Sequence, residues 1–128
     1  MQVAITNDIR ITVEVFYQNN LEKEKNTSNM FAYRITISNE GDFTVKLLKR
    51  HWYITDLAIA KTEVKGDGVV GLQPVLEPGE SHQYVSCCVI ESEIGQMYGS
   101  YTMERQIDGR KFEVKIPKFN LIVPYRSN

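Results

Sequence analysis

The sequence predicts an all-β protein, an immunoglobulin- or fibronectin-III-like β-sandwich of about seven or eight antiparallel strands. Apolar side chains recur at every second position along most of the chain, and no stretch of about ten residues shows helical periodicity. Clusters of Gly, Pro, Asn and Asp separate the short apolar runs, which is typical of sandwiches. The 128 residues form one domain, 1–128, long enough to bury a core without disulfide or metal cross-links. On the alternation pattern alone, a partly open barrel fits as well.

The first half of the chain contains two regular alternating segments. Residues 9–17 place apolar side chains at odd positions with Arg, Thr and Glu between them, which predicts a strand with one buried face. Residues 31–38 repeat the pattern and predict a second strand. The polar stretch 18–29 between them predicts a long mobile loop, and residues 39–42 predict a turn.

The next segment changes phase. Phe43, Val45 and Leu47 occupy odd positions, whereas Trp52 and Ile54 occupy even ones. One extra residue in a strand exchanges its two faces, so the pattern predicts a β-bulge within 48–51. Two separate short strands would give the same pattern.

Turn signals divide the second half. Strands are predicted over 59–65, 82–90, 96–106 and 111–116, with a short last strand over 119–123. Residues 82–90 are apolar on both faces, which is expected of a central strand. Asp108-Gly109, between two alternating runs, predicts a hairpin.

Composition and charge restrict the classes of partner. The 15 basic and 16 acidic residues give a net charge of −1, so the chain lacks the overall basic excess typical of nucleic-acid-binding domains, and the sequence gives no strong nucleic-acid signal. No apolar stretch is long enough to span a membrane, and the N-terminus does not resemble a secretory signal. The only cysteines are neighbours, Cys87 and Cys88, whose side chains point to opposite faces of a strand, so no disulfide is expected. These features predict a protein of the reducing cytoplasm.

The segment 66–71 matches the spacing GxGxxG. A dinucleotide site needs a helix directly after this motif, and Pro74 and Pro78 exclude one. Two interpretations stay open: successive glycine N–H groups form an anion-binding nest beside a cation, or the glycines serve a tight loop that requires positive φ. The candidate ligand-binding residues are Arg50, Lys65, Gly66, Asp67, Gly68 and Gly71.

Catalytic and metal-binding patterns are not evident. His51, His82 and the two cysteines are the only soft or borderline donors, and none forms a CxxC or HxxxH pair. No nucleophile has an adjacent base and no pair of carboxylates is marked out, so we expect no catalytic residue, no metal ligand and no cofactor. Strand alternation places Arg50 and Trp52 on one face and His51 on the other. Arg and Trp are frequent in binding hot spots, although Trp52 also suits a core position.

Several segments together resemble the ApaG family. They occur in the family's order and cover the chain from about residue 31 to residue 124. The matching segments are 31–33 (Phe-Ala-Tyr), 50–56 (Arg-His-Trp-Tyr-Ile-Thr-Asp), 64–76, 78–80 (Pro-Gly-Glu), 95–103 and 116–119 (Ile-Pro-Lys-Phe). Two places depart from the family pattern: Cys87 stands where many members have Gly, and 91–94 lacks a proline common before the Gly-x-Met segment.

The resemblance implies a fibronectin-III-like sandwich and no firm enzymatic activity. Bacterial members resemble an accessory protein whose gene neighbours a diadenosine tetraphosphate hydrolase and whose loss is linked to cobalt and magnesium handling. Eukaryotic relatives carry the domain fused to F-box or polymerase-associated regions, where it serves protein recognition.

We therefore expect a non-enzymatic module that recognises a peptide or protein through an edge strand or the loops at one end of the sandwich. The alternative is binding of a small anion, a nucleotide or pyrophosphate, by the Gly66–Gly71 loop with Lys65 or Arg50. A third hypothesis is an accessory protein in cobalt or magnesium handling. The sequence is compatible with a monomer or a homodimer.

Overall fold

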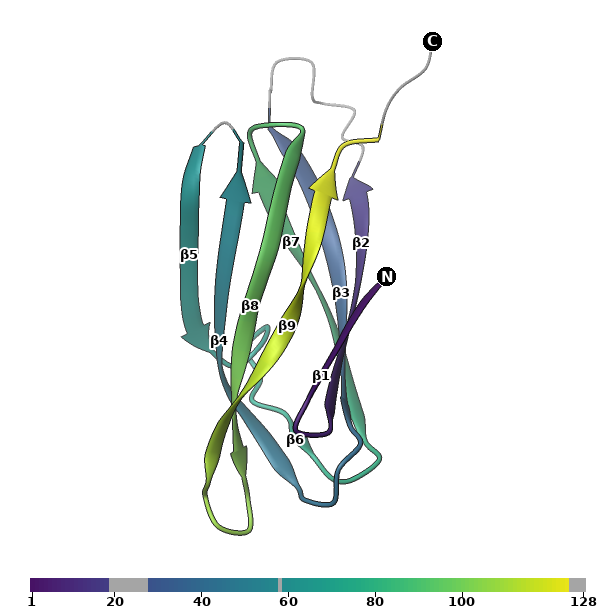
Figure 1. Cartoon of the computed structure of the whole chain (residues 1–128), viewed down its shortest axis with the longest axis vertical. Helices are drawn as coiled ribbons and strands as arrows, with labels where there is room; N and C mark the ends of the chain where they lie inside the picture. Colours follow the sequence, from purple (N-terminus) through teal and green to yellow (C-terminus); the bar gives the residue numbers. More distant parts are fainter. Residues whose placement is uncertain (19–27, 58, 125–128) are drawn as a thin grey trace.

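The computed structural model describes residues 1–18, 28–57 and 59–124. The mobile loop predicted over 18–29 therefore lies outside the described residues except at its ends. The chain forms two packed antiparallel sheets, which confirms the predicted all-β sandwich (Figure 1). In order across the first sheet the strands are β1 (Gln2–Thr6), β2 (Ile9–Gln18), β3 (Asn29–Asn39) and β7 (Ser81–Ile90). Across the second they are β5 (Ile59–Asp67), β4 (Val45–Asp56), β8 (Ile94–Arg105) and β9 (Lys111–Ile122), and β6 (Val75–Leu76) pairs with β4.

The described residues form nine strands where the sequence predicted about seven or eight. The additional strands are β1 and the two-residue β6. The segments predicted separately as 111–116 and 119–123 form the single strand β9, which continues through Pro117.

The predicted bulge is confirmed. The pairing of β4 with β8 shifts between Leu47 and Lys49, so Leu48 is the extra residue. The shift exchanges the faces of β4, which buries Trp52 to 3% exposure and leaves His51 on the outer face of the sheet.

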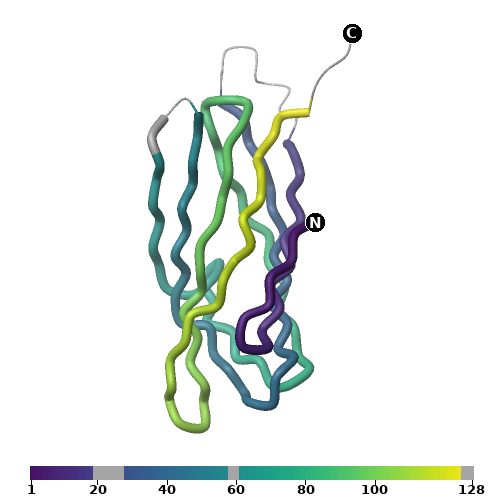
Figure 2. Tube along the Cα trace, viewed as in Figure 1, coloured from purple at the N-terminus to yellow at the C-terminus, as the bar shows by residue number. Residues whose placement is uncertain are grey.

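The core lies between the two sheets and is formed by the buried side chain of every second residue. Tyr33, Trp52 and Phe119 meet in its centre, with ring centroids 5.5 to 5.9 Å apart. Along one side of the sandwich β1 and β2 contact β9, and Figure 2 shows the N-terminal segment beside the C-terminal one there. The edges on the opposite side are β5 and β7.

Candidate functional site

Strand β7 is an edge strand, and the prediction that residues 82–90 form a central strand is wrong. Among the described residues, β7 pairs with β3 alone. Its ten residues, SHQYVSCCVI, contain no Lys, Arg, Asp, Glu or Pro, and its register with β3 is unbroken. Natural edge strands usually carry a charge, a proline or a bulge, because an unprotected edge pairs with other chains. β5, the neighbouring edge of the other sheet, contains Lys61, Glu63 and Lys65.

Half of the backbone groups of β7 point away from β3. The amide N–H of Asn39 donates to Glu80 O at 2.9 Å, and this pair has the same register as the β3–β7 ladder. Hydrogen-bonded pairs alternate in an antiparallel ladder, so every second residue from Gln83 to Val89 directs its N–H and C=O to the free edge.

A cavity of about 340 Å³ lies between the two edges. β7 contributes Tyr84 and Ser86 to its lining, β4 contributes Arg50 and Trp52, and β5 contributes Val64. The cavity thus combines an apolar wall with a few convergent polar groups, which is the usual composition of a binding pocket.

The Arg50 side chain is held in place by the glycine loop. Its Nη1 donates to Asp67 O at 2.8 Å and to Gly68 O at 3.1 Å. Gly66 pairs with Arg50 across the strands, and a Cβ at Gly66 would lie 2.7 Å from the guanidinium carbon. The missing side chain therefore makes room for the guanidinium. No ion pair among the described residues includes Arg50.

Hydroxyl groups lie close to this guanidinium. The Tyr84 and Tyr101 hydroxyls are hydrogen-bonded to each other, and Tyr33 and Ser86 line the same cavity. Burial raises the pKa of all three tyrosines, while the charge of Arg50 opposes the shift. The tyrosines are therefore neutral O–H groups at physiological pH.

Two backbone N–H groups of the loop already have acceptors within the protein. The Gly68 N–H donates to Leu48 O and the Val69 N–H to Leu72 O, each at 2.8 Å. Gly68 has a φ of 61°, and a Cβ there would lie 2.1 Å from Leu72 O. Gly71 has a φ of 76°. These glycines thus serve the tight loop that the sequence left as the second interpretation of the motif.

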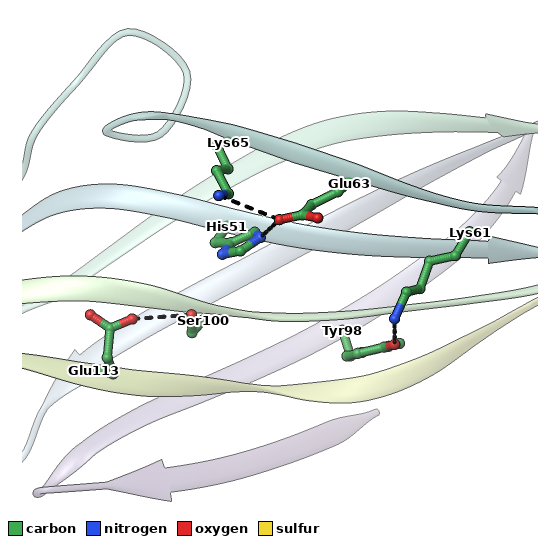
Figure 3. A network of polar contacts seen from close by, with 7 residues as sticks. All are labelled: His51, Lys61, Glu63, Lys65, Tyr98, Ser100 and Glu113. Carbon is green, nitrogen blue, oxygen red and sulfur yellow. Dashed lines mark hydrogen bonds and ion pairs between the residues drawn. The ribbon is translucent and has the colours of Figure 1, made fainter.

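Of the two cations named with the loop, only Arg50 lies against it. Lys65 points to the outer face of the sheet, where its Nζ lies 3.5 Å from Glu63 Oε2. The same carboxylate bonds His51 Nε2 at 2.5 Å, and this bond is the main cause that lowers the pKa of Glu63. Lys61 Nζ donates to the Tyr98 hydroxyl at 3.3 Å in the same exposed network (Figure 3).

The cysteines differ in environment although both are free thiols. Cys87 is exposed on the outer face, whereas Cys88 is buried, which raises the pKa of its thiol to about 11. Among the residues that the structure describes, no three His, Cys, Asp or Glu side chains gather where they could hold a metal ion. Within the same residues there is no helix with the length and apolar character needed to cross a membrane.

Comparison with known sequences decides the family. The model of the ApaG domain matches residues 19–105. The chain belongs to the ApaG family. Protein ApaG of Brucella abortus strain S19 is 44% identical over 124 residues, which cover 97% of this chain and 95% of the relative. Protein ApaG of Sinorhizobium fredii is 41% identical over 124 residues with the same coverage.

Solved structures agree with the ApaG assignment. A structural-genomics target solved by X-ray methods has a TM-score of 0.84 and 39% identity, and covers 94% of this chain and 91% of its own. The ApaA protein of Bordetella pertussis, described as putative, has a TM-score of 0.83 and 37% identity. The match covers 93% of this chain and 96% of that protein. A protein from Archaeoglobus fulgidus at 8% identity and a TM-score of 0.52 shares the fold alone.

Proposed function

We propose that this ApaG protein is a non-enzymatic recognition module that binds an extended peptide segment of a partner protein along β7. The observation that carries the proposal is the unprotected edge: ten residues without charge, proline or bulge, paired on one side among the described residues. A peptide added as a further strand satisfies the free backbone groups of such an edge.

The side chains around the edge favour the same function. Val85 and Val89 project from the outer face of β7 with 56% and 52% exposure. The 340 Å³ cavity opens on the inner face of the same strand. An added strand directs alternate side chains to these two faces, so both can contribute to specificity. The free thiols Cys87 and Cys88 support a cytoplasmic location, where thiols stay reduced.

The test is selection of extended peptides from a display library, followed by amide-resolved NMR of the complex. We expect chemical-shift changes along β7 and β3, with slowed amide exchange at Gln83, Val85, Cys87 and Val89. Val85→Pro removes one edge-facing donor without removing a bond to β3, and should weaken binding at least tenfold, since one main-chain bond is lost and the edge is distorted.

Val85→Thr is the matched control, because it changes the side chain and keeps the N–H; it should bind within about threefold of the parent protein. A footprint on another surface, or equal affinity of the proline and threonine variants, would refute recognition by β7. Sedimentation of the free protein addresses a competing occupant. If β7 pairs with β7 of a second copy at micromolar concentration, the edge is a dimer interface and the peptide proposal is wrong.

A further inference from the structure

The cavity beside β7 lies where a bound peptide would place its inward-facing side chains. A strand added to β7 continues the alternation of that sheet, so every second side chain points toward the other sheet. On β7 the inward-facing neighbours are Tyr84 and Ser86, and the opposite wall is formed by Arg50 and Val64. The volume of about 340 Å³ accommodates a side chain of ordinary size.

The charge in this cavity is not neutralised within the described part of the chain. Arg50 makes no ion pair there, and its two hydrogen bonds both use Nη1. A guanidinium carries donors on three nitrogens, so Nε and Nη2 keep theirs available for a planar acceptor. The Ser86 hydroxyl also lines the cavity and adds a further polar group on the β7 side.

We propose that this cavity is the specificity pocket for an acidic side chain, Asp or Glu, of the peptide that binds β7, with Arg50 as its charged partner. The inference rests on the peptide-binding function proposed above. A Lys or Arg side chain would be repelled by the guanidinium. An apolar side chain would suit Trp52 and Val64 but would cover the donors of Arg50 without satisfying them, which costs free energy.

The absence of a side chain at Gly66 allows the Arg50 guanidinium to lie in the cavity. The guanidinium lies over the backbone of Gly66, and the carbonyls of Asp67 and Gly68 hold one of its nitrogens. The loop thus orients the guanidinium before a ligand arrives, and preorganisation of this kind lowers the entropic cost of binding.

The test uses two capped peptides of alternating Thr and Val that differ at one central position, Glu or its uncharged isostere Gln. Affinity is measured by fluorescence anisotropy, and the site by NMR. We expect the Glu peptide to bind about tenfold to a hundredfold more tightly, as one charge-assisted pair implies. Arg50→Gln should abolish the difference between the two peptides, and the dispersed amide spectrum of the variant is the independent measure that it is folded. Arg50→Lys should restore part of the preference, because it keeps the charge without the fork.

Lys65→Gln is the matched control, since it removes a cation from the outer face of the adjacent strand, and it should keep the full preference. Equal affinities for the two peptides, with a footprint on β7, would overturn the acidic pocket and leave peptide recognition intact. If neither peptide perturbs β7, peptide recognition is wrong as well. If free acetate perturbs the cavity and no peptide gives a footprint along β7, the occupant of the cavity is a small carboxylate. The proposal that the carboxylate belongs to a bound peptide would then be wrong.

Discussion

Replacing Gly66 by Ala tests whether the first glycine of the GxGxxG segment exists to accommodate Arg50. The new Cβ would lie 2.7 to 2.8 Å from the guanidinium carbon and its two terminal nitrogens, so the side chain of Arg50 must move away. It then loses its bonds to Asp67 O and Gly68 O. At about 1 kcal/mol for each bond, the loss is about 2 kcal/mol.

Part of this loss is offset, because alanine in a strand is about 0.5–1 kcal/mol more favourable than glycine. We therefore expect Gly66→Ala to destabilise the protein by about 1–1.5 kcal/mol. In an Arg50→Ala background the guanidinium is absent, so the same substitution should stabilise the protein by about 0.5–1 kcal/mol. The two substitutions should thus be coupled by about 2 kcal/mol.

Urea unfolding of the four proteins of this cycle measures the coupling. The transition midpoints are compared at unchanged m-value, so that only stability differs. If Gly66→Ala changes stability by the same amount in both backgrounds, Gly66 and Arg50 do not interact as described, and the preorganised pocket loses its basis.

Three further predictions concern other parts of the molecule. The hydrogen bond from Arg105 is the main cause that lowers the pKa of Asp108 to about 2. Because the pKa is lower in the folded protein than in the unfolded chain, the pair stabilises the fold at pH values above the ordinary Asp pKa. This stabilisation is lost as the pH falls toward about 2. Asp108→Asn should therefore flatten the acid dependence of Tm below about pH 4, and an unchanged slope would contradict the pairing. Iodoacetamide should label Cys87 well before Cys88, because Cys88 is buried with its pKa raised to about 11, and mass spectrometry of the native protein showing equal rates would refute this. Gly99→Ala should cost about 3 kcal/mol or more in urea unfolding, because its Cβ would lie 2.0 Å from a backbone oxygen of β4, and a loss below about 1 kcal/mol would show that the strands separate freely.

The strands that follow a strict alternation were predictable because each has one face in the core and one in solvent. Residues 9–17 and 31–38 fall within β2 and β3, and the phase change before Trp52 located the bulge. The Asp108-Gly109 hairpin also agrees, with Gly109 at a φ of 72°. In each case a local signal, either periodicity or turn chemistry, was sufficient.

Other elements depend on signals that the alternation does not carry. The sequence analysis did not predict β1, because its apolar residues Val3 and Ile5 are half-exposed. The turn after β1 does have a sequence signal: Asn7 and Asp8 have φ of 48° and 65°, which Asn and Asp tolerate better than most residues. β9 was divided at Pro117 because proline interrupts most strands. Here it lies where the β8–β9 register shifts on a strand that pairs with β8 alone in its sheet, a position that proline tolerates.

The candidate site also combines features that a local sequence signal predicts with features that it does not. Adjacent residues of a strand point to opposite faces, so the alternation already separates Lys65 from Gly66. The sequence also associated Arg50 with the glycine segment, and the structure confirms their contact. The tyrosine hydroxyls could not be placed beside Arg50, because that proximity depends on how one sheet is stacked on the other. Nor could the apolar segment 82–90 be recognised as an edge, because apolar residues on both faces are the usual mark of a central strand.

That failure is informative about function. A strand whose composition suits the middle of a sheet, but which lies at its edge, offers free backbone groups with which a further strand can pair. Apolar side chains on both faces of β7, the free backbone groups from Gln83 to Val89, and the cavity beside Ser86 are the features of a central strand without its second neighbour. A solvated edge would gain from a charge at an exposed position such as Val85 or Val89, and β7 has none. We therefore expect the partner of β7 to be an extended segment that completes the sheet, with one inward side chain that reaches Arg50.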